Sequence, residues 1–189
     1  QVGSSAASDV YKRQELHHPI EYQIHIFDAL MSAGVEFGLK PFGIRAMDAM
    51  RLEKSYRMVG TEMSIEYAAF ESGLDRFVQL QKPDFIGRSG LLAWQEKGFA
   101  NSFVTLEVKD TTDRDVIGGN PIYKEGKLIG RATSGGYGFR IGKSLALAMV
   151  APDCTDIGAS LEIDILGDRF AAEIIEESPF DPANERLRA

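Results

Sequence analysis

Residues 43 to 92 carry three runs that decide the fold: GIRAMDAMRLEKSYRMVG (43–60), EYAAFESGLDRFV (66–78) and KPDFIGRSGLL (82–92). Pro41 and Gly43 precede the first run, and Glu53 and Arg57 stand at the favourable i,i+4 spacing. We therefore expect a helix from about residue 44 to 57. The later runs predict a short strand at 76–80 and a helix at 89–97 ended by Gly98. Helices interleaved with short strands indicate an α+β layer.

Upstream of these runs, apolar residues recur at helical spacing. Ile20, Ile24, Phe27 and Met31 line one face, and polar residues line the other. Pro19 precedes the pattern and Gly34 follows it, as at the two ends of a helix. This segment is predicted to be an amphipathic helix.

Downstream of Gly98 the sequence changes to short β-rich runs between turn residues. The dipeptides Glu125-Gly126 and Gly167-Asp168 each lie between two runs at hairpin distance. Six strands are enough to close a small barrel or sandwich. We predict a boundary near residue 98 and strands at FVTLEV (103–108), PIYK (121–124), LIGRATS (128–134), SLALAMV (144–150), LEIDIL (161–166) and FAAEIIEE (170–177).

Composition excludes several classes of protein. The 189 residues carry a formal charge of -7, and the basic residues are dispersed along the chain. The chain therefore lacks the clustered positive charge that is typical of a nucleic-acid-binding protein. The apolar runs are too short to span a membrane. The single cysteine, Cys154, allows no intramolecular disulfide and indicates a reducing compartment. Residues 1–14, QVGSSAASDVYKRQ, lack a signal pattern and are interpreted as foreign to the fold or as a flexible tail.

Two motifs invite a functional interpretation that their spacing does not support. GGYGFRIGKS (135–144) resembles a P-loop, but Tyr137 stands where the first glycine belongs, and the stretch lies between β runs. His17, His18 and His25 have no Cys, Asp or Glu at ligand spacing, so no metal site is predicted. A flavin-binding G-x-G-x-x-G motif does not occur.

The three opening runs, together with residues 121–150 and SPFDPANERLR (178–188), resemble the folate-dependent aminomethyltransferases in collinear order. That family comprises the T-protein of the glycine cleavage system and the folate-binding half of sarcosine and dimethylglycine dehydrogenases. RAMDAMRLEKSYR and DFIGR favour the dehydrogenase branch. The resemblance implies an α+β fold: a foreign or disordered tail (1–14), the remainder of a folate-binding domain (15–98) and a six-stranded antiparallel β-barrel (99–189).

The resemblance also implies which residues meet the folate. ELHHP (15–19) matches the end of the family's pterin-binding block, so Glu15 is the expected cofactor-binding residue. A carboxylate there can accept two parallel N–H bonds from the pterin. The family's folate-contacting arginine is replaced by Met47, and Arg45 and Arg51 are candidates to compensate or exposed helix charges. No catalytic residue is predicted in this chain, because the family's catalytic aspartate lies upstream of Glu15; Asp48, Glu53 and Glu71 are expected to serve in ion pairs and caps.

The function implied is tetrahydrofolate-dependent transfer of an aminomethyl group from a small methylamine donor. FAD is expected only if a separate flavoprotein domain precedes the chain. One alternative is a non-catalytic folate-binding protein of the tRNA-modification or iron-sulfur type, although KPDFIGRS (82–89) lacks the cysteine of its motif. The other is an inactive fragment, which is the outcome expected for the isolated chain. The expected compartment is the cytoplasm, with the mitochondrial matrix as the alternative, and neither nucleic acid nor membrane is expected as a partner.

Overall fold

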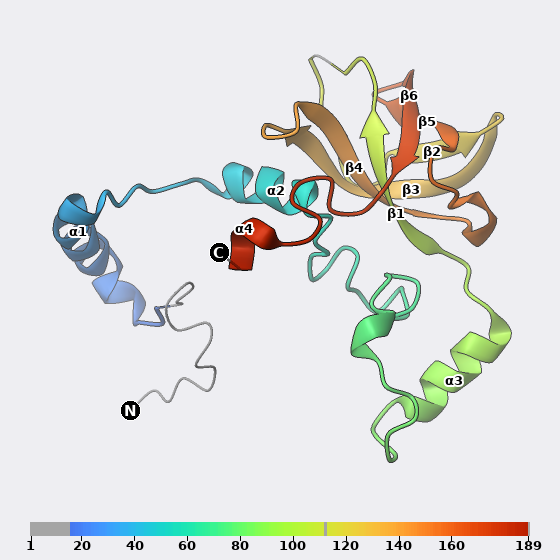
Figure 1. Cartoon of the computed structure of the whole chain (residues 1–189), viewed down its shortest axis with the longest axis horizontal. Helices are drawn as coiled ribbons and strands as arrows, with labels where there is room; N and C mark the ends of the chain where they lie inside the picture. The colour runs from blue at the N-terminus through green and yellow to red at the C-terminus, as the bar shows by residue number, and fades with distance from the viewer. Residues whose placement is uncertain (1–15, 112, 189) are drawn as a thin grey trace. The chain divides into compact units, whose positions relative to one another are not determined.

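The structure is a computed structural model that describes residues 16–111 and 113–188. The chain divides into two compact units, residues 1–42 and residues 43–189, and the barrel strands belong to the second (Figure 1). Glu15 lies outside the described residues.

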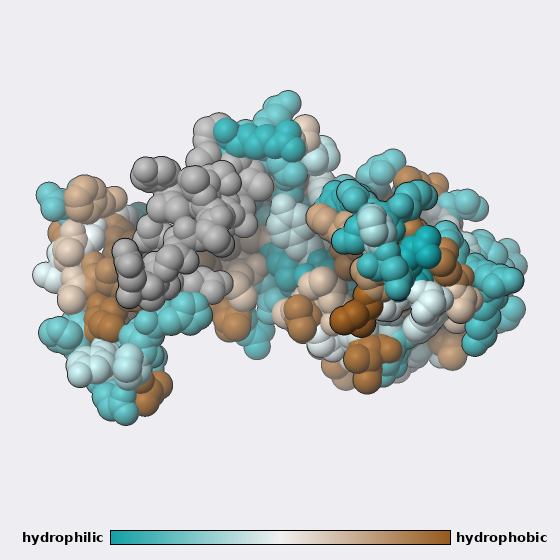
Figure 2. Space-filling model, turned by 90° about the horizontal axis from the view of Figure 1, so that it is seen from below, coloured by the Kyte–Doolittle hydropathy of each residue, from teal (hydrophilic) through white to brown (hydrophobic). Residues whose placement is uncertain are grey.

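The first unit contains the amphipathic helix that the sequence predicts. A 3₁₀ turn (Ile20–Tyr22) leads into α1 (Gln23–Ala33), and a second 3₁₀ turn (Val35–Phe37) follows. Gly34 ends α1, donating its N–H to the carbonyl of Leu30 at 2.8 Å. The apolar side chains of Ile24, Phe27 and Leu30 are all more than half exposed. Figure 2 shows hydrophobic residues, in brown, at the surface of the molecule.

The second unit begins with α2 (Ile44–Glu53), four residues shorter than predicted. Ser55 has a φ of 51°, in the left-handed region, and the N–H groups of Lys54, Ser55 and Tyr56 turn back onto the carbonyls of residues 51 and 52. The predicted Glu53–Arg57 pair is therefore wrong, because Arg57 lies past the end of the helix.

The predicted strand at 76–80 is also wrong. That segment holds a 3₁₀ turn (Asp75–Phe77) followed by irregular chain. Within described residues 16–100 the sole β pairing is an isolated bridge between Val59 and Met63. Helix α3 (Arg88–Lys97) confirms the prediction, and Gly98 follows it with a φ of 85°.

The barrel is confirmed as six antiparallel strands in the closed order β1-β4-β3-β2-β5-β6. The bounds of the strands are Ser102–Val108 (β1), Pro121–Lys124 (β2), Lys127–Gly138 (β3), Lys143–Val150 (β4), Ser160–Ile165 (β5) and Asp168–Ile175 (β6). Closure leaves no unpaired edge among these strands.

Two tight turns set the register of the barrel hairpins. Glu125 and Gly126 join β2 to β3 with φ of 51° and 77°, so both central residues are left-handed, as a type I′ turn requires. Leu166 and Gly167 join β5 to β6, with Ile165 opposite Asp168. The second turn therefore starts one residue earlier than the predicted Gly167-Asp168.

Strand β4 serves two cores because its side chains alternate between two faces. Ala146, Ala148 and Val150 face the barrel interior. Leu145, Leu147 and Met149 pack outside it against Leu52 of α2. This second core fixes α2 against β3 and β4.

Buried carboxylates and the C-terminal segment attach the helical region to the barrel. Glu53 accepts the N–H of Arg140 at 2.6 Å, and Glu71 accepts the N–H of Asn101 at 3.0 Å. Arg57 holds Glu177 through two bonds of 2.6 and 2.8 Å, with its guanidinium 3.7 Å from the centre of the Phe103 ring. These contacts tie residues 53–71 to the barrel and to the chain that follows β6.

Candidate functional site

The residues that the resemblance singled out lie on or beside α2. Met47 is partly exposed on that helix. Arg51 was expected either to compensate or to be an exposed helix charge, but its side chain is mostly buried, with Nε 3.3 Å from Asp48 and NH1 3.0 Å from the Tyr56 carbonyl. Arg51 is thereby committed to the C-terminal end of α2.

Arg45 is the remaining candidate on α2. It makes no hydrogen bond or ion pair with any described residue, and it lines a cavity of about 230 Å³ with Asp48, Asp115 and Tyr137. Two positions along a helix are about 200° apart, so Arg45 lies on nearly the opposite side of α2 from Met47. Neither arginine is therefore available to replace the arginine that the family has at the position of Met47.

Of the three carboxylates assigned to ion pairing and capping, Asp48 forms an ion pair, with Arg51. Glu53 accepts the N–H groups of residues 140 and 141 in the turn between β3 and β4, and Glu71 accepts those of residues 68, 100 and 101. The P-loop-like stretch forms the end of β3, a turn and the start of β4. Gly142 in that turn donates its N–H to the carbonyl of Gly138. The described residues contain no group of three or more His, Cys, Asp or Glu able to hold a metal ion.

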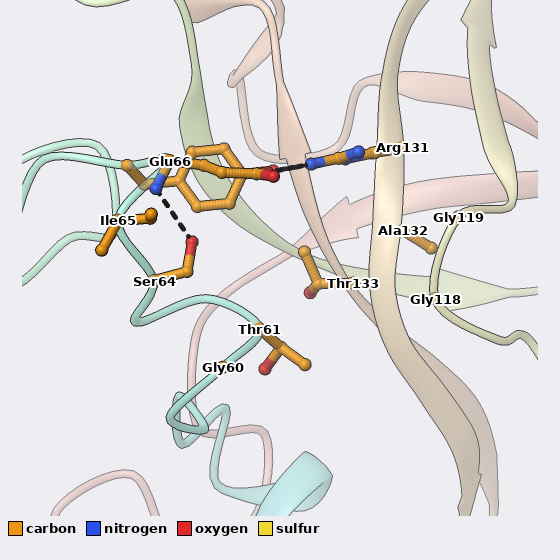
Figure 3. A pocket seen from close by; sticks show the side chains of 11 residues that line it. Gly60, Thr61, Ser64, Ile65, Glu66, Gly118, Gly119, Arg131, Ala132 and Thr133 are labelled. Atoms are coloured by element: carbon orange, nitrogen blue, oxygen red, sulfur yellow. Dashed lines mark hydrogen bonds and ion pairs between the residues drawn. The ribbon is translucent and has the colours of Figure 1, made fainter.

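A second cavity was not predicted from the sequence. Its volume is about 310 Å³, and we call it the hydroxyl pocket. It lies between the turn that follows α2 and strand β3 of the barrel (Figure 3). Its lining residues are Gly60, Thr61, Ser64, Ile65, Glu66, Tyr67, Gly118, Gly119, Arg131, Ala132 and Thr133.

A β-bulge brings Thr133 to this pocket. Ala132 pairs with Ala148 and Ser134 with Leu147, so Thr133 is the extra residue of β3. A bulge re-aims the side chain of the extra residue. Figure 3 shows the side chains of Thr133, Thr61 and Ser64 around one space.

Glu62 lies directly behind the two threonines and is fully buried. Its Oε2 accepts the N–H of Met58 at 2.9 Å and the hydroxyl of Thr61 at 2.6 Å. Its Oε1 accepts the hydroxyls of Thr133 and Ser134, the latter at 3.1 Å. Burial raises the pKa of Glu62, but the bonds from Thr133, Thr61 and Met58 outweigh it and hold the pKa below its ordinary 4.5.

Arg131 spans the opposite side of the hydroxyl pocket. Its NH2 donates to Glu66 at 2.5 Å and to the Tyr67 hydroxyl at 2.8 Å, and its Nε reaches the same hydroxyl at 3.3 Å. NH1 makes no hydrogen bond with a described residue. The guanidinium is thus fixed in place with donors to spare.

The hydroxyl pocket is suited to binding rather than bond breaking. It presents hydroxyl oxygens and a guanidinium, and the carboxylate in contact with its threonine hydroxyls, Glu62, has a lowered pKa that makes it a poor base for activating an alcohol. Glu62 was missed because TEMS (61–64) reads as an ordinary polar turn. The available signal was that Thr61 and Glu62 follow Gly60, a turn residue in the irregular chain between α2 and the barrel.

The comparisons with known proteins match both parts of the chain. The family GCVT N-terminal domain matches residues 14–82, and the family Glycine cleavage T-protein C-terminal barrel domain matches residues 101–181. Human mitochondrial dimethylglycine dehydrogenase is 40% identical over 177 residues, covering 92% of this chain and 20% of the relative. The aminomethyltransferase of Desulfitobacterium hafniense is 33% identical over 162 residues, covering 85% and 44%.

The 4-methylaminobutanoate oxidase (formaldehyde-forming) of Paenarthrobacter nicotinovorans is 30% identical, with 92% of this chain and 21% of the relative covered. A crystal structure of glycine cleavage system aminomethyltransferase T from Bartonella henselae has the same fold, with a TM-score of 0.75 and 21% identity over 87% of this chain and 45% of that one.

The chain spans about a fifth of the dehydrogenases and less than half of the aminomethyltransferases that it matches. In the part of the chain that the structure describes, no helix is long and apolar enough to cross a membrane. With both family matches in chain order and a barrel behind the second, the chain belongs to the glycine cleavage T-protein family.

Proposed function

We propose that this chain is part of a tetrahydrofolate-binding module that transfers one-carbon units from aminomethyl donors, in the branch of the dimethylglycine dehydrogenases. The observation that carries the proposal is the pair of family matches in chain order, with dimethylglycine dehydrogenase 40% identical over almost the whole chain. We divide the chain into a tail (1–14), a folate-binding portion (15–98) and the barrel domain (99–189).

Helix α2 fits one face of a folate. Ile44, Met47 and Met50 are exposed along the helix, and these flexible apolar side chains suit the flat face of a ring. The same face has no cation for the carboxylates of the ligand, because Arg51 is committed to Asp48 and Arg45 lines the other side. We infer that α2 packs against the ring portion and that the charged tail is bound by another part of the complete protein.

Tetrahydrofolate supplies an amine that takes up the one-carbon unit. Glu15 anchors the pterin by accepting its N–H donors, and a carboxylate upstream of this chain acts as the base. The donor is a small methylamine. Its oxidation in the dehydrogenase branch would require FAD in a separate flavoprotein domain. The mammalian relatives are named mitochondrial, which favours the mitochondrial matrix over the cytoplasm if this protein shares their compartment.

Calorimetry tests the binding role of Glu15 in a longer protein that also carries the proposed upstream portion with the catalytic carboxylate. Losing a charge-assisted hydrogen bond costs roughly 1.5 to 3 kcal/mol, so Glu15→Ala should weaken tetrahydrofolate about ten- to a hundred-fold. Glu15→Gln should recover little, because its amide group sets a donor against the donors of the pterin. Glu21→Ala is the matched control, since Glu21 is exposed on a neighbouring turn. Equal affinity of the Glu15→Ala and Glu21→Ala variants would remove Glu15 from the site.

A further inference from the structure

A buried charge lies behind two of the hydroxyls that line the hydroxyl pocket, and no described residue gives it a counter-charge through a hydrogen bond or ion pair. Glu62 is fully buried, and its four described hydrogen bonds come from three hydroxyls and one backbone N–H, with no cation among them. Buried carboxylates are normally paired with a cation or a metal. Glu53 and Glu71 are also buried, but their partners are mainly backbone N–H groups, and none of those partners lines this cavity, whereas Thr61 and Thr133 do.

The hydroxyls in front of Glu62 can only accept further bonds from the pocket side. The Thr61 hydroxyl contacts Glu62 at 2.6 Å and the Met58 carbonyl at 3.1 Å. The Thr133 hydroxyl contacts Glu62 and the Leu147 carbonyl, the latter at 3.0 Å. Each hydroxyl has one hydrogen for two acceptors, so only oxygen lone pairs remain toward the cavity. A group that binds here must donate, and a cationic donor would also offset the charge of Glu62.

The opposite wall requires the complementary group. The NH1 donors of Arg131 have no described partner, and the bonds to Glu66 and Tyr67 hold the guanidinium in place. Figure 3 shows Arg131 and Glu66 meeting on one side of the cavity, with Thr61 and Thr133 below them. A carboxylate suits the planar fork of a guanidinium.

We propose that the hydroxyl pocket binds a small zwitterion of the α-amino acid class, with its ammonium group at Thr61 and Thr133 and its carboxylate at Arg131. The volume of about 310 Å³ is at the small end of the range for ligand pockets. The site is separate from the exposed face of α2 assigned to folate and does not depend on that assignment.

Glycine is the probe, and ¹H–¹⁵N spectra of the complete chain are the readout. Glycine should shift the amide signals of Thr61, Gly119 and Thr133 with a dissociation constant on the order of 1 mM, as usual for so small a ligand. Acetate and methylammonium each supply one half of the ligand and should bind at least about ten-fold more weakly. Glycine betaine keeps both charges but has no N–H donor, so it should not bind.

Variants locate the two halves of the site. Thr133→Val keeps the shape of the side chain and removes the hydroxyl, and it should weaken glycine about ten-fold. Arg131→Met should abolish the shifts. The matched controls are Thr155→Val and Arg169→Met, because neither residue lines the cavity. Both controls should leave glycine binding unchanged.

Several results would overturn the proposal. If glycine shifted no amide signals of the unaltered chain, the proposed amino-acid site would be excluded. This measurement does not depend on whether a variant folds. Equal binding of acetate or betaine would exclude the ammonium contact. Equal binding of methylammonium would exclude Arg131 as the carboxylate partner. A loss of binding in the Thr155→Val or Arg169→Met control as large as in the pocket variants would place the ligand elsewhere.

Discussion

At the scale of single residues, Glu62 should make stability depend on pH. Its pKa in the folded chain is held below the ordinary 4.5. A depressed pKa contributes stability that is present above pH 4.5 and is lost as the pH falls below that value toward the folded-state pKa. Glu62→Gln should therefore be less stable than the unaltered chain by about 1 to 3 kcal/mol at pH 7, and the difference should shrink in acid.

Urea unfolding across this pH range measures the effect. Glu66→Gln is the control, because Glu66 is 62% exposed in its pair with Arg131, and exposed pairs contribute roughly 0 to 1 kcal/mol. A Glu62→Gln deficit that stays constant from neutral pH to acid would contradict the role of the ionised carboxylate.

The residues that the sequence could not assign are those whose partners are distant along the chain. Glu53 bonds to the N–H groups of residues 140 and 141, and Glu62 bonds to hydroxyls at 133 and 134. Local spacing offered Glu53 a partner in Arg57, but Arg57 binds Glu177 instead. Helical spacing therefore predicted the wrong pair, because the helix ends before Arg57.

At the scale of elements, substitutions at the two residues of the turn between β2 and β3 should change the stability of the chain in opposite directions. Gly126 has a φ of 77°, so Gly126→Ala should destabilise the chain by about 1 to 2 kcal/mol. Glu125 has a φ of 51° without the freedom of glycine, and Glu125→Asn should stabilise by about 0.5 to 1 kcal/mol because Asn tolerates this region.

Gly90→Ala is the matched control for the turn. Gly90 lies inside α3, and a methyl group there would meet no atom within 4 Å. Alanine in a helix interior is better than glycine by roughly 0.8 to 1 kcal/mol, so this variant should gain stability. Urea unfolding compares the variants, and equal stability of Gly126→Ala and the unaltered chain would contradict the turn geometry.

At this scale, the elements with strong signals in their own local sequence are the ones that were predicted correctly. The barrel strands combine apolar runs with turns whose geometry only Gly or Asn accepts readily, as at Glu125-Gly126. Residues 76–80 have the composition of a strand, but the described chain offers them no partner strand, so they stay irregular. The early end of α2 depends on the left-handed Ser55, whose hydroxyl accepts the N–H of Ser178 at 2.9 Å. A contact so distant in sequence gives no local signal.

At the scale of the whole molecule, the two units should differ in local stability. Strand β4 pairs on both sides within the closed barrel, and Leu145 to Val150 are buried. Helix α1 exposes most of its apolar side chains. Hydrogen exchange should show stronger protection in residues 145–150 than in 24–30, since protection follows burial and packing. The reverse order would contradict the barrel as the stable part.

Tetrahydrofolate-dependent product formation is the decisive test of the proposed one-carbon transfer. A longer protein in which a family sequence with the catalytic carboxylate is joined upstream of this chain should form 5,10-methylenetetrahydrofolate from an aminomethyl donor and tetrahydrofolate. The 189-residue chain alone should form none, because the catalytic carboxylate is assigned upstream. Two results would contradict the proposed function: failure of the joined protein to bind and convert tetrahydrofolate, or product formation by the 189-residue chain alone at the same rate.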